Sequence, residues 1–153
     1  MSSLEPLSVF PVLRYLFFAN TGISSLDPLK FHGHLKSLHI PENPIENLAP
    51  LKDLIKLEEL NISDTPITNL KDLEFFINLK KFNCSGTQIK NLKYLRNLDR
   101  LEQLEIQNTP VNSLSSLNEK APLKRLVCYN TRLSERKLAS FKEMFPDCQV
   151  TFY

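Results

Sequence analysis

The stretch LEELNISDTPITNLKDL, residues 57–73, contains the apolar spacing that decides the fold. Its first leucine is one of six that stand 22 residues apart: Leu13, Leu35, Leu57, Leu79, Leu101 and Leu123. Each of the six opens the pattern L-x-x-[LF]-x-[LIFC]-x-x-[TN]-x-[ILV]. A period of this length is typical of a solenoid, in which one structural unit stacks on the next. The sequence therefore predicts a regular array and not one irregular core.

Two kinds of local structure are indicated by the way the apolar spacing changes within one repeat. In the first segment Leu60 and Ile62 alternate with polar residues, as a half-buried strand of about five residues requires. Further along, apolar residues recur at every third position, as at Leu70, Leu73 and Phe76, which favours a tight 3₁₀ turn over an α-helix. Three prolines share one position of the repeat and lack the backbone donor that a longer helix needs: Pro6, Pro28 and Pro50.

The stretch over residues 57–73 resembles a leucine-rich repeat, and the 22-residue period resembles the bacterial internalin and phosphatase-regulator subclass. The resemblance covers almost the whole chain, because the pattern recurs in register. It implies an α/β solenoid, a right-handed curved array with a concave parallel sheet of about seven short strands and a convex side of 3₁₀ turns. Proteins that resemble it in this way generally bind other proteins.

The chain departs from this family at one buried position, where the family usually has asparagine. Asparagine stands there only in the repeat that carries Asn43, and the other repeats have threonine: Thr21, Thr65, Thr87, Thr109 and Thr131. A threonine hydroxyl can still satisfy a neighbouring backbone group, but it has fewer donors and acceptors than an amide. We therefore expect a weakened ladder of side-chain hydrogen bonds.

The whole chain, residues 1–153, is predicted to be one domain, because this length can bury one continuous core along stacked repeats. Residues 1–12 match the second half of a repeat, since Leu4 and Leu7 stand one period before Leu26 and Leu29. Residues 13–133 carry the full repeats, and we expect residues 134–153 to form a cap.

The cap is predicted from a change in apolar spacing after residue 133. Leu138 and Phe141 fall on one side of an α-helix, and Ser134 is placed to be its N-cap. A terminal unit of this kind shields the core that it ends, and the tail resembles the endings of many short bacterial leucine-rich-repeat proteins. The repeat pattern reappears in degraded form one period after Leu123, as a last strand: Phe145, Cys148 and Val150.

Composition narrows the classes of partner. The chain has 19 Lys and Arg against 17 Asp and Glu, with both signs mixed along it, which argues against a nucleic-acid or anionic-membrane surface. No apolar stretch approaches the roughly 20 residues that cross a bilayer, and the start lacks the features of a signal peptide. We expect a cytoplasmic protein without membrane insertion, or a cell-surface location if the chain is a fragment of a longer protein.

The three cysteines are predicted to be buried free thiols. Cys84 and Cys128 share an inward position two strands apart, about 10 Å, which is too far for a disulfide. Cys148 takes another inward position about 8 Å from Cys128 by the same spacing. Free cysteines of this kind behave as small hydrophobes and indicate a reducing compartment. A cysteine hydrolase would need an exposed thiolate beside a base, so no catalytic residue is assigned and the protein is not expected to be an enzyme.

No metal or cofactor site is predicted. His32, His34 and His39 are close in sequence, but the first two precede a strand and the third projects from it, so three ligands would not converge. The three glycines are scattered and form no phosphate-binding loop.

The outward positions of the predicted strands form the candidate binding face. Aromatic residues gather at the two ends of this face and polar residues fill its middle, which is the usual composition of binding hot spots. The best contacts are Tyr15 with Phe17 at one end and Arg125 with Val127 and Tyr129 at the other, although Phe17 could instead only cover the open N-terminal edge. The full candidate set is Tyr15, Phe17, His39, Glu59, Asn61, Lys81, Asn83, Gln103, Glu105, Arg125, Val127 and Tyr129.

Two rows of charge have structural explanations. One strand position alternates in sign and is predicted to help the register of the sheet: Glu58, Lys80, Glu102 and Lys124. A basic row on the convex side is predicted to be a solvated face: Lys90, Lys93, Arg96 and Arg100.

The sequence therefore favours a non-catalytic module that binds an unknown protein or peptide on its concave face. The alternative is a structural spacer within a longer bacterial surface protein. An apolar N-terminal edge, formed by the rung of Leu13, Leu16 and Phe18, further predicts weak self-association.

Overall fold

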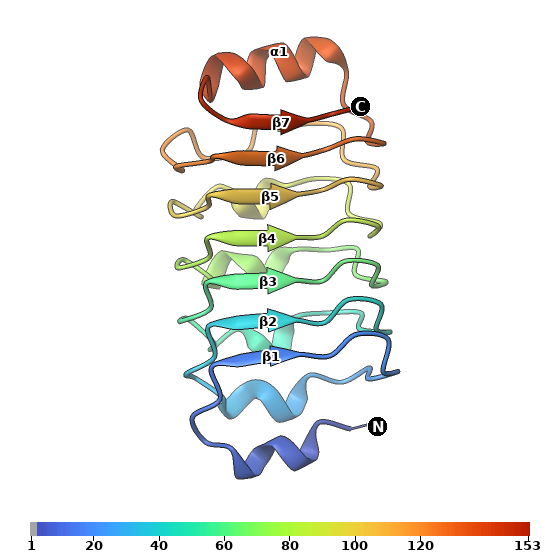
Figure 1. The fold of residues 1–153 in the computed structure, drawn as a ribbon, viewed down its shortest axis with the longest axis vertical. Helices are drawn as coiled ribbons and strands as arrows, with labels where there is room; N and C mark the ends of the chain where they lie inside the picture. The colour runs from blue at the N-terminus through green and yellow to red at the C-terminus, as the bar shows by residue number, and fades with distance from the viewer. Residues whose placement is uncertain (1–2) are drawn as a thin grey trace.

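The computed structural model describes residues 3–153 and shows one stack of parallel strands (Figure 1). The strands follow one another in chain order across a single sheet, so each repeat pairs with the next along the array. The sheet comprises β1 (Tyr15–Phe17), β2 (Ser37–His39), β3 (Glu59–Asn61), β4 (Lys81–Asn83), β5 (Gln103–Glu105), β6 (Arg125–Val127) and β7 (Gln149–Thr151). The predicted α/β solenoid with a parallel sheet is confirmed.

Each strand has three residues, fewer than the predicted five, but the backbone ladder continues at both ends. Between β1 and β2, for example, Lys36 N donates to Arg14 O at 2.8 Å and Phe18 N donates to His39 O at 3.0 Å. Pairing joins residues one period apart from β1 to β6, as with Leu38 and Leu60. Such a constant register places equivalent side chains in straight rows across the sheet.

The side of the array behind the sheet is formed by 3₁₀ turns, as the three-residue spacing predicts. Five are present among the described residues: η1 (Glu5–Val9), η2 (Asp27–Phe31), η3 (Ala49–Leu51), η4 (Lys71–Phe75) and η5 (Lys93–Leu95). The prolines stand in the first turn of η1, η2 and η3, where the missing N–H costs no hydrogen bond. Between β5 and β6 the corresponding segment, residues 113–118, forms turns without a 3₁₀ helix.

The C-terminal cap contains the helix α1 (Glu135–Met144), which covers the end of the array beside β7 (Figure 1). Leu138 and Phe141, on the inner face of this helix, are buried, as predicted. Ser134 has the extended backbone of an N-cap residue, but its side chain forms no capping hydrogen bond. The helix also changes the register: Val150 pairs with Leu126, 24 residues earlier. The predicted 22-residue spacing of the last strand is therefore wrong, because the repeat that contains α1 is two residues longer than the others.

The asparagine and threonine ladder has two forms. Thr65, Thr87 and Thr109 each donate a hydrogen bond to the carbonyl three residues earlier, at 2.6 to 2.7 Å, so each closes the turn of its own repeat. Asn43 Nδ2 also donates within its own repeat, to Ile40 O and Pro41 O, and in addition it reaches the preceding repeat and donates to Phe18 O at 2.9 Å. The ladder thus joins neighbouring repeats only through Asn43 among the described members of this position.

Candidate functional site

The sheet register gathers the predicted contact residues on one face. The first outward position of each strand forms the row Tyr15, Ser37, Glu59, Lys81, Gln103 and Arg125, and the third forms the row Phe17, His39, Asn61, Asn83, Glu105 and Val127. Seven of the predicted residues line one shallow hollow of about 240 Å³ in the middle of this face: His39, Glu59, Asn61, Lys81, Asn83, Gln103 and Glu105.

Glu59 is the centre of the first charged cluster in this hollow. Lys81 Nζ lies 2.7 Å from Glu59 Oε1, and His39 Nε2 lies 3.7 Å from Glu59 Oε2. The hydrogen bond from Lys81 is the main reason that the pKa of Glu59 is lowered, and the same bond raises the pKa of Lys81. Both groups therefore stay charged at neutral pH, and a partner meets a fixed pair of charges here.

A second polar cluster follows on the next strands. Asn83 Nδ2 donates to Glu105 Oε2 at 3.0 Å, and Arg125 approaches Glu105 Oε1 at 3.9 Å. Asn83 Oδ1 accepts from Ser85 N at 2.9 Å, which holds the amide in place. The polar side chains in the middle of the face thus mostly bond to one another. In a complex they would orient the partner more than they would raise its affinity.

The N-terminal end of the face is the more exposed aromatic surface. Tyr15 is 69% exposed and Phe17 is 68% exposed. The Phe17 ring meets the His39 ring edge to face, with centroids 6.3 Å apart. Phe10 and Val12, in the segment between η1 and β1, are also exposed. Exposed apolar groups gathered in this way are typical of an interaction site.

The C-terminal end differs from the prediction at Val127. Arg125 is exposed and Tyr129 is half-buried, but Val127 is only 6% exposed and is not available as a contact. Its short side chain lies in a row between Glu105 of β5 and Thr151 of β7, so little of it reaches solvent. The aromatic anchor at this end is therefore weaker than that formed by Tyr15 and Phe17.

The alternating charges flank the strands as ion pairs. Glu58 accepts from Lys80 Nζ at 2.7 Å and from Lys36 Nζ at 3.0 Å, and Lys124 Nζ lies 2.7 Å from Glu102. The hydrogen bonds from Lys80 and then Lys36 lower the pKa of Glu58 to about 2. These pairs join adjacent repeats, which agrees with a role in sheet register.

The groups considered for chemistry are mostly inside the protein. Cys84, Cys128 and Cys148 are buried free thiols, and burial raises the pKa of Cys128 and of Cys148 to about 11 and raises that of Cys84 further. His32 is also buried, with Nε2 at 3.1 Å from Leu7 O. Within residues 3–153 no three His, Cys, Asp or Glu side chains gather as a metal site would require. None of the helices in the same residues has the length and hydrophobicity that a bilayer crossing demands.

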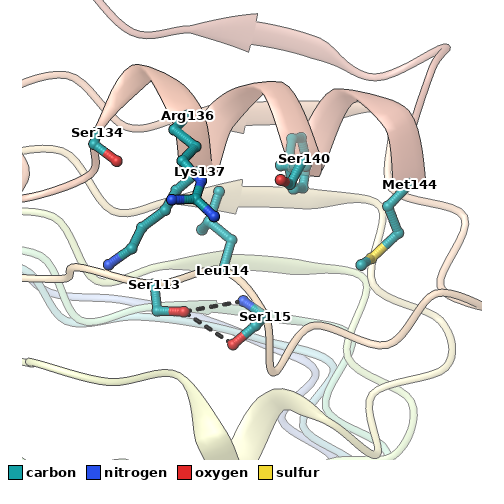
Figure 2. Close-up of a pocket in the computed structure, with 9 residues that line it drawn as sticks. Ser113, Leu114, Ser115, Ser134, Arg136, Lys137, Ser140 and Met144 are labelled. Atoms are coloured by element: carbon teal, nitrogen blue, oxygen red, sulfur yellow. Dashed lines mark hydrogen bonds between the residues drawn. The ribbon is translucent and has the colours of Figure 1, made fainter.

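A second hollow lies between α1 and the segment that follows β5, and the sequence reasoning missed it. Figure 2 shows side chains from the two segments facing one another across this groove, which has a volume of about 430 Å³. It is lined by Ser113, Leu114, Ser115, Ser134, Arg136, Lys137, Ser140, Phe141 and Met144. The one available signal was the group of serines at residues 113, 115 and 116, since no other repeat has serine at all three of these positions.

Solved structures share this fold over almost the whole chain. Internalin C2 from Listeria monocytogenes matches 99% of the chain at 20% identity with a TM-score of 0.87, and internalin F from the same organism matches 99% at 20% identity with a TM-score of 0.76. A leucine-rich-repeat protein of Leptospira interrogans matches 95% at 23% identity with a TM-score of 0.84. No protein-family model matches the sequence, and no curated protein compared with it does either.

The chain spans only part of each of these structures: 51% of internalin F, 66% of internalin C2 and 38% of the Leptospira protein. The likeness is one of fold. It shows that the stacked strands and 3₁₀ turns form a curved leucine-rich-repeat solenoid like that of the internalins.

Proposed function

We propose that this leucine-rich-repeat solenoid is a non-catalytic module that binds a protein or peptide across its concave sheet. The observation that carries the proposal is the pair of exposed aromatic side chains, Tyr15 and Phe17, beside the charged hollow around Glu59. Aromatic anchors next to a polar surface are the usual source of binding energy in protein interfaces. The burial of all three thiols supports the non-catalytic part of the proposal, since a nucleophilic cysteine must be accessible.

The charge pattern supports a protein partner over a nucleic acid. On the concave face Lys81 and Arg125 are each matched by a carboxylate, Glu59 and Glu105. A nucleic-acid surface instead presents clustered cations that are free to contact phosphates. The free thiols favour a reducing compartment, hence the cytoplasm, with the cell surface as the alternative for a longer protein.

The test compares three double variants for the proteins that they retain from a lysate of the cells that express this chain. Tyr15→Ser with Phe17→Ser should weaken retention of the partner at least tenfold, because truncating a buried anchor costs about 2 kcal/mol or more. Arg125→Ala with Tyr129→Ala should weaken it less, because Tyr129 is already half-buried in the free protein.

Charge reversal at Lys90 and Lys93 on the convex side is the matched control and should leave retention unchanged. All variants should keep the melting temperature of the wild type, since the altered concave side chains point away from the core. If the convex variant loses the partner while both concave variants keep it, the array is better explained as a spacer.

We also propose that the N-terminal edge allows weak self-association. Among the described residues β1 pairs with β2 alone. In the predicted rung Leu13 and Leu16 are half-buried and Phe18 is 8% exposed, while Tyr15 and Phe17 of the edge strand itself are exposed. An unpaired strand edge with an apolar surround favours pairing with another chain. Sedimentation equilibrium should show a concentration-dependent increase in mass that the Tyr15→Ser, Phe17→Ser variant lacks. A strict monomer at millimolar concentration would contradict this proposal and leave the concave-face proposal intact.

A further inference from the structure

The groove beside α1 has a partly apolar floor. Leu114 and Phe141 lie beneath this floor in the hydrophobic core and are only 4% and 3% exposed, so the half-buried Met144 is the apolar lining residue with accessible surface. The space exists because residues 113–118 lack the 3₁₀ helix that the other repeats carry and have small side chains at positions 113, 115 and 116. A volume of about 430 Å³ falls within the range of ligand-binding clefts and is large enough for one or two amino-acid side chains.

The walls of the groove are positively charged. Arg136 and Lys137 are its charged lining residues, and no acidic side chain lines it. Arg136 forms no ion pair with any residue that the structure describes, whereas Lys137 donates to the backbone carbonyl of Asn112. The N-terminus of α1, at Ser134, adds its partial positive charge at the same end of the groove. The charge at this end therefore lacks a counterpart within the groove.

The remaining walls carry hydroxyl groups. Ser134 forms no capping hydrogen bond, and the Ser140 side chain stands on the exposed side of α1 above the groove (Figure 2). Ser113 and Ser115 bond to one another across the opposite wall. Hydroxyl groups can donate to or accept from the backbone of a peptide, which has one donor and one acceptor in each residue.

We propose that this groove binds a short segment of a partner protein in which an apolar side chain adjoins an acidic one. The apolar side chain packs on Met144, above the buried Leu114 and Phe141, and the carboxylate lies against Arg136 and Lys137. The apolar floor and the cationic wall of the groove match the apolar and acidic side chains of such a segment. Charge-assisted hydrogen bonds from arginine to a carboxylate are among the stronger polar contacts. This site lies beside the cap and is separate from the concave face, so it does not depend on the function proposed above.

The protein offers a direct reporter for this groove. It contains two methionines, Met1 and Met144, so labelling with methyl-¹³C methionine places one of two signals in the groove itself. The probe is the blocked peptide acetyl-Gly-Leu-Phe-Glu-Asp-Gly-amide, titrated into the full chain. A second peptide replaces Glu and Asp by Lys, and a third replaces Leu and Phe by Ser. We expect a saturable shift of the Met144 methyl signal with the first peptide and at least tenfold weaker effects with the other two.

Variants of α1 locate the site. Arg136→Glu should weaken binding of the first peptide at least tenfold. Lys142→Glu is the matched control, since it makes the same change of charge on the same helix at a residue that does not line the groove, and it should bind as the wild type does. Ser140→Trp, at an exposed helical position, should fill the groove and abolish the shift while amide spectra report an intact fold.

Three outcomes of the peptide titrations would overturn the proposal: no shift in the wild type up to the solubility limit of the peptide, equal binding by the Arg136→Glu and Lys142→Glu proteins, or equal binding of all three peptides. Dodecanoate, added below its micellar concentration, tests the other chemistry that fits an apolar floor and two cations. If dodecanoate binds at least tenfold more tightly than the acidic peptide, the occupant is a small amphiphilic anion and the peptide assignment is wrong. The Tyr15→Ser, Phe17→Ser variant should bind the peptide normally, which separates this test from that of the concave face.

Discussion

Asn43 and Thr21 are joined across two repeats, because Asn43 Oδ1 accepts hydrogen bonds from the backbone N–H of Thr21 at 3.0 Å and from its hydroxyl at 2.9 Å. The amide nitrogen of Asn43 donates to Phe18 O in the same preceding repeat. One buried side chain therefore holds the turn after β1 against the turn after β2. The threonines at the equivalent positions further along bond within their own repeats.

Replacement Asn43→Thr should lower the free energy of unfolding. A threonine at this position closes its own turn, but it leaves Phe18 O and the Thr21 donors without their present partner. Each buried group left unsatisfied costs about 1–3 kcal/mol, so urea denaturation should show a loss of at least about that size. Thr109→Val, which removes one hydrogen bond and keeps the shape, is the control and should cost about 1 kcal/mol. Equal losses in the two variants would mean that the link between repeats adds nothing.

The stability that Glu58 contributes should be lost as the pH falls. Its pKa is about 2 in the folded protein against an ordinary value of 4.5, because Lys80 and Lys36 stabilise the carboxylate. A lowered folded-state pKa contributes stability that is full above pH 4.5 and is lost as the pH falls toward 2. Glu58→Gln should therefore flatten the dependence of the urea midpoint on pH between 4.5 and 2. An unchanged slope in the Glu58→Gln protein would show that other carboxylates account for the acid sensitivity.

The thiols should be almost inert in the folded protein. A pKa of about 11 for Cys128 and Cys148, against the usual 9, lowers the thiolate fraction at pH 8 by about 100-fold, and burial blocks access as well. Ellman's reagent should therefore label native protein at least 100-fold more slowly than protein in guanidinium chloride. Rapid labelling of one native thiol would reopen the question of a cysteine enzyme.

Replacement of Glu42 by asparagine should stabilise the protein. It has φ of +56°, a left-handed conformation that glutamate rarely adopts, and equivalent turns carry Asn20, Asn108 and Asn130 in the same conformation. Asparagine adopts this region at lower cost, so Glu42→Asn should raise the free energy of unfolding by up to about 1 kcal/mol. Glu46→Asn, at an exposed residue outside this position, is the control and should change stability little. A destabilised Glu42→Asn protein would mean that glutamate makes contacts that offset its strain.

The fold was predictable because each 22-residue period of the sequence forms one strand and one turn of the stack. Leu38, Leu60, Phe82 and Leu104 fall at the same repeat position, so they form one buried row whatever the details of the turns. Alternation along each strand likewise predicted that Tyr15 and Glu59 share the outer face. These features depend on local spacing, which a single sequence records in full.

The ends of the array were harder to predict, because periodicity carries no information where the repeat changes. Val127 occupies an outward position by its spacing, but its exposure depends on neighbours in β5 and β7 that only the three-dimensional structure reveals. The pairing of Val150 with Leu126 depends on the number of residues in the segment between β6 and β7, which contains α1. The groove around Met144 depends on a 3₁₀ helix that is missing between β5 and β6, and an absent element leaves little trace in the apolar pattern.

The pairing of β7 with β6 does not depend on how many repeats precede β6. Its partners stand 24 residues earlier and not 22, but Val150 still pairs with the inward Leu126, so the row of inward side chains continues across the junction. A whole repeat inserted or deleted upstream leaves this pairing between β6 and β7 untouched. The cap can therefore terminate longer or shorter relatives of this array, and duplication of 22-residue units would enlarge the binding surface without any adjustment at the C-terminus.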